Sequence, residues 1–229
     1  QLFRSHQVTL LSSEGNSRNI KIEKMIPDGK PPMILKIDVR LNRPKTVEQA
    51  LRRKGFNHFT SLIGEERHSK FRKIVREESK MTKEYVVGTL LLTEFCPNGD
   101  LRTKSQNMHK ENTRNPKIIT DTIDYFQQMG NIMIDLQDKG AVFPDAKNSN
   151  WLIDENNRLK ISDTKSLMFT TDNQQIDPDD TKNQWTKGLV YSRHLLPPDM
   201  INLAHGEQIA VDPLHAYMLG KNLYEFLTN

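Results

Sequence analysis

The chain changes character once along its length, at CPNGDL (96–101), and this change limits the folds that it can adopt. Before it, short apolar runs with β-formers predict strands, and one run of helix formers that ends near a glycine predicts a helix over 46–56. The expected strands are 8–11, 18–26, 32–39, 71–78 and 89–95, with PDGK (27–30) as the turn of a hairpin between the second and the third. A strand-rich part followed by a helical part predicts an α+β fold, with a first lobe over 1–95 and a second over 96–229.

Helical periodicity dominates the second part. Residues 116–138 repeat apolar side chains at helical spacing, with Asn115 as the cap and Pro116 in the first turn. The expected buried face consists of Ile119, Ile123, Phe126, Met129, Met133 and Leu136. A hairpin is expected at 151–162, a segment of weak pattern at 163–199, and a last helix over 213–228. That helix is expected to bury Leu214, Met218, Leu219, Leu223, Phe226 and Leu227.

Composition argues against several classes of protein. The longest apolar runs, such as GTLLLTEF (88–95), fall far short of the roughly 20 residues of a spanning helix, so no membrane span is expected, and no signal segment is visible. Cys96 is the only cysteine, which excludes an internal disulfide and favours a reducing compartment. The histidines lack the spacing of zinc ligands. The net charge of +4 comes from basic residues interleaved with glutamates, so nucleic acid is not an expected partner.

The loop FPDAKNSN (143–150) carries the pattern D-x-K-x-x-N between the long helix and the hairpin. Turn residues can produce such a triplet by chance, because Asp, Asn and Lys are common in loops. The order of elements around it nevertheless resembles the eukaryotic-type protein kinase, whose catalytic loop reads H-R-D-x-K-x-x-N. By this resemblance, Asp145 accepts the proton of the substrate hydroxyl, and Lys147 neutralises charge on the γ-phosphate of ATP. Asn150 and Asp163 then bind Mg²⁺, or Mn²⁺ in its place.

The first lobe carries a further match to the kinase family. Lys36 in MILKIDV resembles the strand lysine that contacts the α- and β-phosphates and pairs with a helix glutamate. Glu48 is the best candidate for that glutamate, with Glu65 and Glu66 as rivals. A solvent-facing strand lysine is the alternative interpretation of Lys36.

The run TEFCPNGDL (93–101) resembles the segment that joins the two kinase lobes, with Thr93 at the gatekeeper position. The resemblance assigns the Glu94 carbonyl and the Cys96 amide to adenine, and Asp100 to the ribose. Leu152 becomes the floor of the adenine pocket, although a buried strand leucine explains it equally well. The other two residues that the resemblance assigns to the nucleotide are Gly15 and Ile20.

Several positions depart from the kinase pattern. The glycine-rich loop is reduced to SEGNSR (13–18), which keeps Gly15 alone. Phe143 and Pro144 replace the His and Arg of H-R-D, and TK (164–165) replaces the Phe and Gly of D-F-G. The activation segment is expected at about 163–199, and LPPDM (196–200) resembles its A-P-E end. In the last helix, His215 stands where the family has an Asp that anchors the catalytic loop, so either His215 acts differently or Asp212 takes over.

The resemblance implies an ATP-dependent Ser/Thr protein kinase, because a lysine two residues after the catalytic Asp is the serine/threonine pattern. Two alternatives stay open: a pseudokinase that binds nucleotide or protein, and a small-molecule phosphotransferase of kinase-like fold. The degenerate motifs and the Asn/Lys-rich composition also resemble kinases that intracellular bacteria such as Legionella inject into host cells. A cytoplasmic location is expected, which would be the host cytosol in that case. The expected partners are a protein substrate and an activating or scaffolding protein, since Pro144 cannot bind a phosphate on the activation segment.

Overall fold

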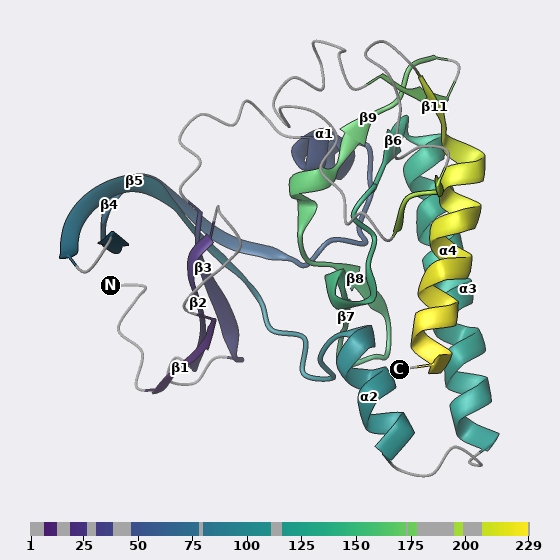
Figure 1. The fold of residues 1–229 in the computed structure, drawn as a ribbon, viewed down its shortest axis with the longest axis horizontal. Coiled ribbons are helices and arrows are strands. Elements are labelled where there is room, and N and C mark those ends of the chain that lie inside the picture. The colour runs from purple at the N-terminus through teal and green to yellow at the C-terminus, as the bar shows by residue number, and fades with distance from the viewer. Residues whose placement is uncertain are drawn as a thin grey trace. The chain divides into compact units, whose positions relative to one another are not determined.

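The computed structural model describes residues 7–12, 19–26, 31–38, 47–77, 80–110, 116–172, 174–177, 195–198 and 208–228 (Figure 1). The chain forms two compact units. Unit 1 consists of residues 1–44 and 60–95, and unit 2 of residues 45–59 and 96–229. Residues 45–59 were expected with the first lobe, but they group with the helical unit.

Unit 1 is one antiparallel sheet in the order β1-β2-β3-β5-β4. Its strands are β1 Gln7–Ser12, β2 Asn19–Ile26, β3 Met33–Asp38, β4 Leu62–Glu77 and β5 Lys80–Glu94. Strands β2 and β3 pair as the sequence predicted, while the turn expected at 27–30 lies outside the described residues. Strands β4 and β5 are longer than predicted, because charged residues interrupt the apolar pattern over much of their length.

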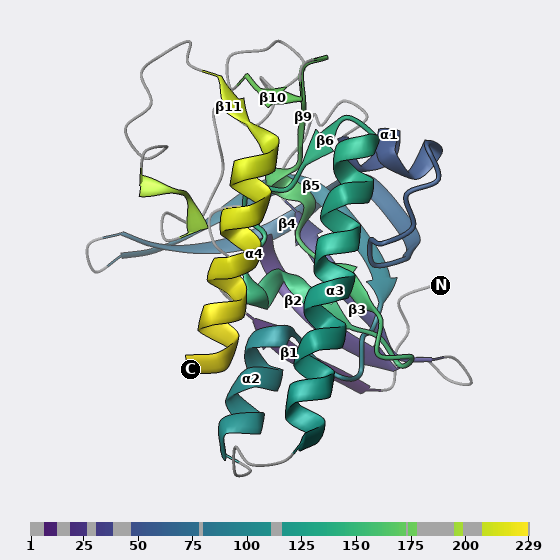
Figure 2. The same cartoon turned by 90° about the vertical axis from the view of Figure 1, so that its right-hand side faces the viewer.

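Unit 2 is built around helices α2 Leu101–Lys110, α3 Pro116–Asp138 and α4 Val211–Thr228. Helices α3 and α4 lie side by side (Figures 1 and 2), and the rings of Phe126 and Phe226 meet edge to face at 5.5 Å between them. Ser105 on α2 donates a buried hydrogen bond of 2.6 Å to the Phe226 carbonyl. The three helices therefore share one core.

The prediction of helix α3 is confirmed at both ends, but part of its expected buried face is exposed. Phe126, Met129, Met133 and Leu136 are buried. Ile119 and Ile123 are 64% and 54% exposed, so their predicted burial is wrong. On α4, Leu227 is likewise exposed at 51%, and Leu219 and Leu223 are only partly buried. Helical spacing identifies an apolar face, but it does not say how much of that face a neighbour covers.

Short elements complete unit 2. The strand pairs are β6 Ala141–Val142 with β9 Met168–Phe169, β7 Trp151–Ile153 with β8 Leu159–Ile161, and β10 Gln175–Ile176 with β11 Ile209–Ala210. Two 3₁₀ turns, η1 Asn148–Asn150 and η2 Thr164–Ser166, flank the hairpin β7–β8. No helix among these described parts is both long and apolar enough to cross a bilayer.

Helix α1 Val47–Arg53 packs on unit 2 through its own residues and those that follow it. Leu51, Phe56 and Phe59 are fully buried in the core of that unit. The amide of Ile161 in β8 donates to the His58 carbonyl at 2.7 Å. These contacts explain why 45–59 group with the helical unit.

Candidate active site

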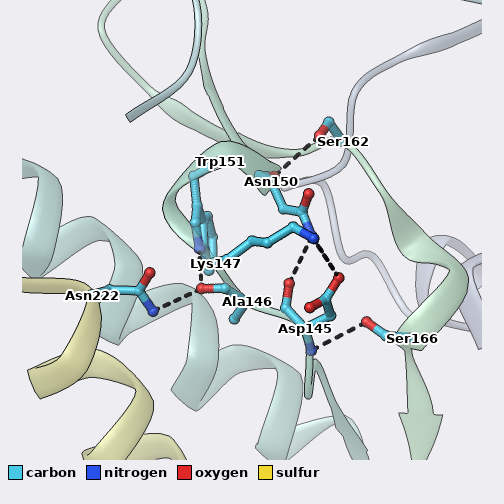
Figure 3. Close-up of polar contacts among 8 residues, drawn as sticks. All are labelled: Asp145, Ala146, Lys147, Asn150, Trp151, Ser162, Ser166 and Asn222. Atoms are coloured by element: carbon cyan, nitrogen blue, oxygen red, sulfur yellow. Dashed lines mark hydrogen bonds and ion pairs between the residues drawn. The ribbon is translucent and has the colours of Figure 1, made fainter. Parts of the chain in front are cut away.

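The loop between β6 and β7 is folded back on itself by a short helical turn. The Lys147 amide donates to the Asp145 carbonyl at 2.9 Å, and the Asn150 amide donates to the Lys147 carbonyl at 2.8 Å. Residues 148–150 form the 3₁₀ turn η1, in which i to i+3 hydrogen bonds close a tight ring. This turn returns Asn150 to Asp145, so the triplet D-x-K-x-x-N forms one cluster (Figure 3).

Asp145 is a buried carboxylate with two partners inside this cluster. The residue is 4% exposed. Lys147 Nζ lies 3.2 Å from Asp145 Oδ2, and Asn150 Nδ2 donates to the same oxygen at 3.2 Å and to the Asp145 carbonyl at 2.7 Å. A buried charge is costly unless it is paired and hydrogen-bonded, and these contacts meet that condition. The structure therefore brings together all three residues that the resemblance assigned to catalysis.

Two side chains that the sequence analysis missed hold the backbone next to Asp145. The carbonyl of Ala146 accepts one hydrogen bond from Trp151 Nε1 at 3.0 Å and another from Asn222 Nδ2 at 2.8 Å (Figure 3). Trp151 and Asn222 are both fully buried. A signal for Asn222 was present in the sequence, because it interrupts an otherwise apolar stripe on α4.

The segment after β8 forms hydrogen bonds with the backbone of the same loop. The amide and the hydroxyl of Ser162 donate to the Asn150 carbonyl at 3.1 and 3.2 Å. The amide of Asp145 donates to the hydroxyl of Ser166 at 3.3 Å. Asp163 directly follows Ser162, so its backbone lies next to the residue that binds the Asn150 carbonyl.

Asn150 and Asp163, the predicted Mg²⁺ ligands, carry the oxygen groups that a hard divalent cation prefers. The hydrogen bonds of Asn150 to Asp145 use Nδ2, which leaves the role of a cation ligand to Oδ1. In the part of the chain that the structure describes, no group of three or more His, Cys, Asp or Glu side chains could hold a metal. One amide oxygen and one carboxylate suit Mg²⁺, which is commonly bound by one or two protein groups together with waters and substrate phosphates.

Glu48 on α1 is bound to the segment that replaces D-F-G. Its Oε1 accepts from Arg52 at 3.0 and 2.8 Å, and its Oε2 accepts from the hydroxyl of Thr164 at 2.5 Å. The resemblance aligns Thr164 with the packing Phe of D-F-G. At this position the structure has a hydrogen bond to a carboxylate.

For the predicted phosphate-binding residues of unit 1, the structure describes at most the backbone. Gly15 lies outside the described residues, and the side chains of Ile20 in β2 and Lys36 in β3 are not described. Lys36 is placed opposite Ile22 and Leu91 in the sheet. Glu65 and Glu66 lie in β4 opposite Leu91 and Leu90, again without described side chains. The pairing of Lys36 with Glu48 or with one of its rivals stays a prediction.

Thr93 and Glu94 end strand β5 of unit 1. Thr93 is buried, and Glu94 pairs with the start of β4, since its amide donates to the Ser61 carbonyl at 3.0 Å and its Oε1 accepts from the Ser61 amide at 2.6 Å. In unit 2, Cys96 is buried and its carbonyl accepts from the Gly99 amide at 3.4 Å. Gly99 has a φ of +75°, a conformation that suits glycine and turns the chain into α2.

Asp100 and Leu152 lie opposite each other in unit 2, joined by an isolated antiparallel bridge. The Asp100 carboxylate accepts from the amide and the hydroxyl of Thr103 at 2.8 and 3.2 Å, as an N-cap of α2. The structure gives this predicted ribose ligand a structural role of its own. Leu152 is partly buried in β7.

Phe143 and Pro144, which replace the His and Arg of H-R-D, are both buried in the core. Phe143 is fully buried, and its ring meets that of Trp151 edge to face at 5.9 Å. Pro144 is buried beside it. An apolar pair therefore supports the loop where the kinase pattern has polar side chains.

His215 does not take over the anchoring role of the family's Asp. It is 7% exposed, and its Nε2 has no hydrogen-bond partner among the described residues. Burial lowers its pKa to about 4, and the negative charge of Asp212 opposes that shift only in part. Asp212 itself is exposed and accepts from Gln137 Nε2 at 2.6 Å. The hydrogen bond from α4 to the loop comes from Asn222 instead.

Comparison with solved structures identifies the fold. The LegK7 effector kinase of Legionella pneumophila superposes with a TM-score of 0.57 and 20% identity, over 89% of this chain and 43% of that one. ROP2 from Toxoplasma gondii, described as a virulence factor with a protein-kinase fold and no enzymatic activity, superposes with a TM-score of 0.61 and 14% identity, over 96% of this chain and 63% of that one. The chain has a divergent protein-kinase-like fold.

The predicted α+β class is thereby confirmed, and the chain spans less than two thirds of the length of either relative. No family model matches the chain, and no curated protein matches its sequence. At identities of 20% and 14%, the two likenesses concern the fold alone. One relative is an effector kinase and the other has no enzymatic activity, so this fold hosts both functions.

Proposed function

We propose that this protein transfers the γ-phosphate of ATP to a serine or threonine hydroxyl of a protein substrate, with Mg²⁺ as the metal. One observation carries the proposal: the buried carboxylate of Asp145 is held by Lys147 and Asn150 in a single closed loop. Phosphoryl transfer depends on positioning and on charge neutralisation, and these three side chains supply both.

Each residue of the loop has a distinct task in this proposal. Asp145 accepts the proton of the attacking hydroxyl, because an ionised carboxylate is a hydrogen-bond acceptor with two oxygens and can act as a general base. Lys147 lies 3.2 Å from that carboxylate and is 27% exposed, so its ammonium can also reach a phosphate at the surface of the loop. Asn150 and Asp163 would hold Mg²⁺, which when bound neutralises charge on the phosphates.

The two solved relatives support a biological setting for this activity. One is described as an effector kinase of Legionella pneumophila and the other as a virulence factor of Toxoplasma gondii. We extend this setting to the present chain as part of the proposal, with proteins of a host cell as its substrates.

A pseudokinase is the second candidate, and the contacts of Glu48 favour it. Both oxygens of this carboxylate are engaged inside unit 2, by Arg52 and by Thr164. An active kinase needs a helix glutamate to hold the phosphate-binding lysine. If Glu48 cannot leave these partners, the chain binds nucleotide or protein without transferring phosphate.

A transfer assay separates the two functions. The purified chain is incubated with ATP labelled in the γ-position, a generic basic protein and Mg²⁺, and a parallel sample contains a chelator instead of the metal. The kinase proposal predicts label in the protein only when Mg²⁺ is present. Nucleotide binding without any transfer, tested over several substrate proteins, would instead establish the pseudokinase.

A further inference from the structure

The peptide between Ala146 and Lys147 is fixed by two side chains from different elements. Ala146 contributes only its carbonyl oxygen, which can accept two hydrogen bonds. Trp151 of β7 supplies one donor at 3.0 Å, and Asn222 of α4 supplies the other at 2.8 Å (Figure 3). Both lone pairs of this oxygen are thus used.

The amide group of Asn222 is placed for donation rather than for acceptance. Its Nδ2 donates to the Ala146 carbonyl and to the Met218 carbonyl, each at 2.8 Å. Since both neighbours are carbonyl oxygens, only the NH₂ end of the side chain fits there. Its Oδ1 is buried without a hydrogen-bond partner in the described part of the chain. Burying this oxygen without a partner costs free energy, and a hydrocarbon side chain of similar size would avoid that cost. Such a side chain would also lose the hydrogen bond to the Ala146 carbonyl.

The position of Asn222 on α4 strengthens this interpretation. Leu214, Met218 and Phe226 are buried at intervals of four residues on the same helix, and Asn222 is the polar member of that series. A second contact joins the same two elements, because Asn148 Nδ2 donates to the Asn222 carbonyl at 3.0 Å. Asn222 therefore binds the residue before Lys147 through its side chain and the residue after Lys147 through its backbone carbonyl.

The rest of the Asp145 backbone is bound as well. Its carbonyl accepts from Asn150 Nδ2 at 2.7 Å, and its amide donates to Ser166 at 3.3 Å. The Ala146 carbonyl and the Lys147 amide belong to one peptide group, and this amide donates to the Asp145 carbonyl at 2.9 Å. Rotation of the 146–147 peptide would therefore break the contacts to β7 and α4 and also the hydrogen bond to the Asp145 carbonyl. The contacts to Ala146 and the position of the Asp145 backbone thus depend on each other.

We propose that Asn222 and Trp151 are positioning residues, which aim the Asp145 carboxylate by holding the Ala146 carbonyl. The proposal rests on the phosphoryl transfer proposed above. Neither side chain touches reacting atoms, so both act through the loop. A misplacement of about 1 Å can cost roughly a hundredfold in rate, which sets the scale of the expected effect.

Asn222→Leu and Trp151→Phe each remove one donor and keep a side chain of related shape. Each is expected to lower kcat by about ten- to hundredfold, while KM for ATP stays within about threefold. The double variant is expected to lose less than the product of the single losses, because both donors serve one acceptor. Ser105→Ala is the matched control, since it removes a buried hydrogen bond to the same helix, at the Phe226 carbonyl. Its kcat is expected to stay within about twofold of the wild type.

Two kinetic outcomes would overturn the proposal. One is an unchanged kcat in a folded Asn222→Leu or Trp151→Phe protein. The other is an equal loss of kcat in Ser105→Ala, which would mean that any weakening of α4 slows the reaction.

A spectroscopic readout decides the matter without any activity. The chain has two tryptophans, Trp151 and Trp185, so Trp185→Phe assigns the two indole N–H signals in an NMR spectrum. The Trp151 N–H is expected to exchange slowly with solvent in the wild type and to shift in Asn222→Leu. Fast exchange of this proton in the wild type would overturn the proposal even if Asn222→Leu does not fold. Slow exchange in a protein that transfers no phosphate would refute the proposed function and leave the anchored loop intact.

Discussion

Lowering the pH below neutral is expected to destabilise the folded protein because of His215. Its imidazole is buried in α4, and burial lowers its pKa from 6.5 to about 4. In the unfolded chain the side chain titrates near its ordinary value. Between these two pKa values the unfolded state therefore binds a proton that the folded state excludes, and acid favours unfolding.

The size of this effect follows from the two pKa values. Above pH 6.5 both states are neutral and the contribution of His215 is fully present. Lowering the pH from 7 to 5 reduces the free energy of unfolding by about 2 kcal/mol through this residue, and the loss levels off near pH 4, where the folded state is protonated too.

The assay compares the wild type with His215→Leu by urea unfolding at pH 7, 6 and 5. The variant has no imidazole to protonate, so its stability is expected to fall less over this range, by about 2 kcal/mol at pH 5. Half-buried His58, whose pKa burial also lowers, is present in both proteins and cancels in the difference. Parallel curves for the two proteins would refute the burial of a neutral His215.

Three other substitutions test separate parts of the structure. Met133→Ala is expected to cost about 2–5 kcal/mol of stability, because Met133 is only 2% exposed. The neighbouring Ile134→Ala is expected to cost less than about 0.5 kcal/mol, because Ile134 is 59% exposed. Equal losses in urea unfolding would contradict the packing of α3. Thr164→Val is expected to cost about 1–2 kcal/mol through the lost hydrogen bond to Glu48, and Thr164→Ser to restore most of it in the same assay. Lys147→Met is expected to lower kcat about a hundredfold or more, with nucleotide affinity changed less than tenfold, and an unchanged kcat in steady-state assays would remove Lys147 from the site.

Local sequence signals were sufficient where one short segment determines the structure. Helix α3 begins at Pro116 and ends at Asp138 as predicted, because the proline suits a first turn and the apolar period is long. The cluster of Asp145, Lys147 and Asn150 was also predictable, since all three residues lie in one short loop that the 3₁₀ turn at 148–150 folds back. The kinase resemblance supplied the roles that spacing alone does not give.

Local sequence signals did not predict contacts between residues that lie far apart in the chain, nor how much of a helix face is buried. The contact of Asn222 with Ala146 joins residues 76 positions apart, and no local pattern reports such a pair. An Asn in the apolar stripe of α4 was the available hint, because a polar residue at a buried position needs a partner. Ile119, Ile123 and Leu227 failed in the opposite sense, since the helical period predicts an apolar face whether or not another element covers it.

The central claim is that the Asp145 carboxylate acts on the acceptor hydroxyl in phosphoryl transfer. Asp145→Asn keeps the shape of the side chain and removes its charge, and the direct test is single-turnover transfer from labelled ATP together with nucleotide affinity. The rate is expected to fall at least about a hundredfold while the nucleotide Kd changes less than about threefold, because Asp145 serves the acceptor and not the nucleotide. Transfer by Asp145→Asn at the wild-type rate would contradict the claim.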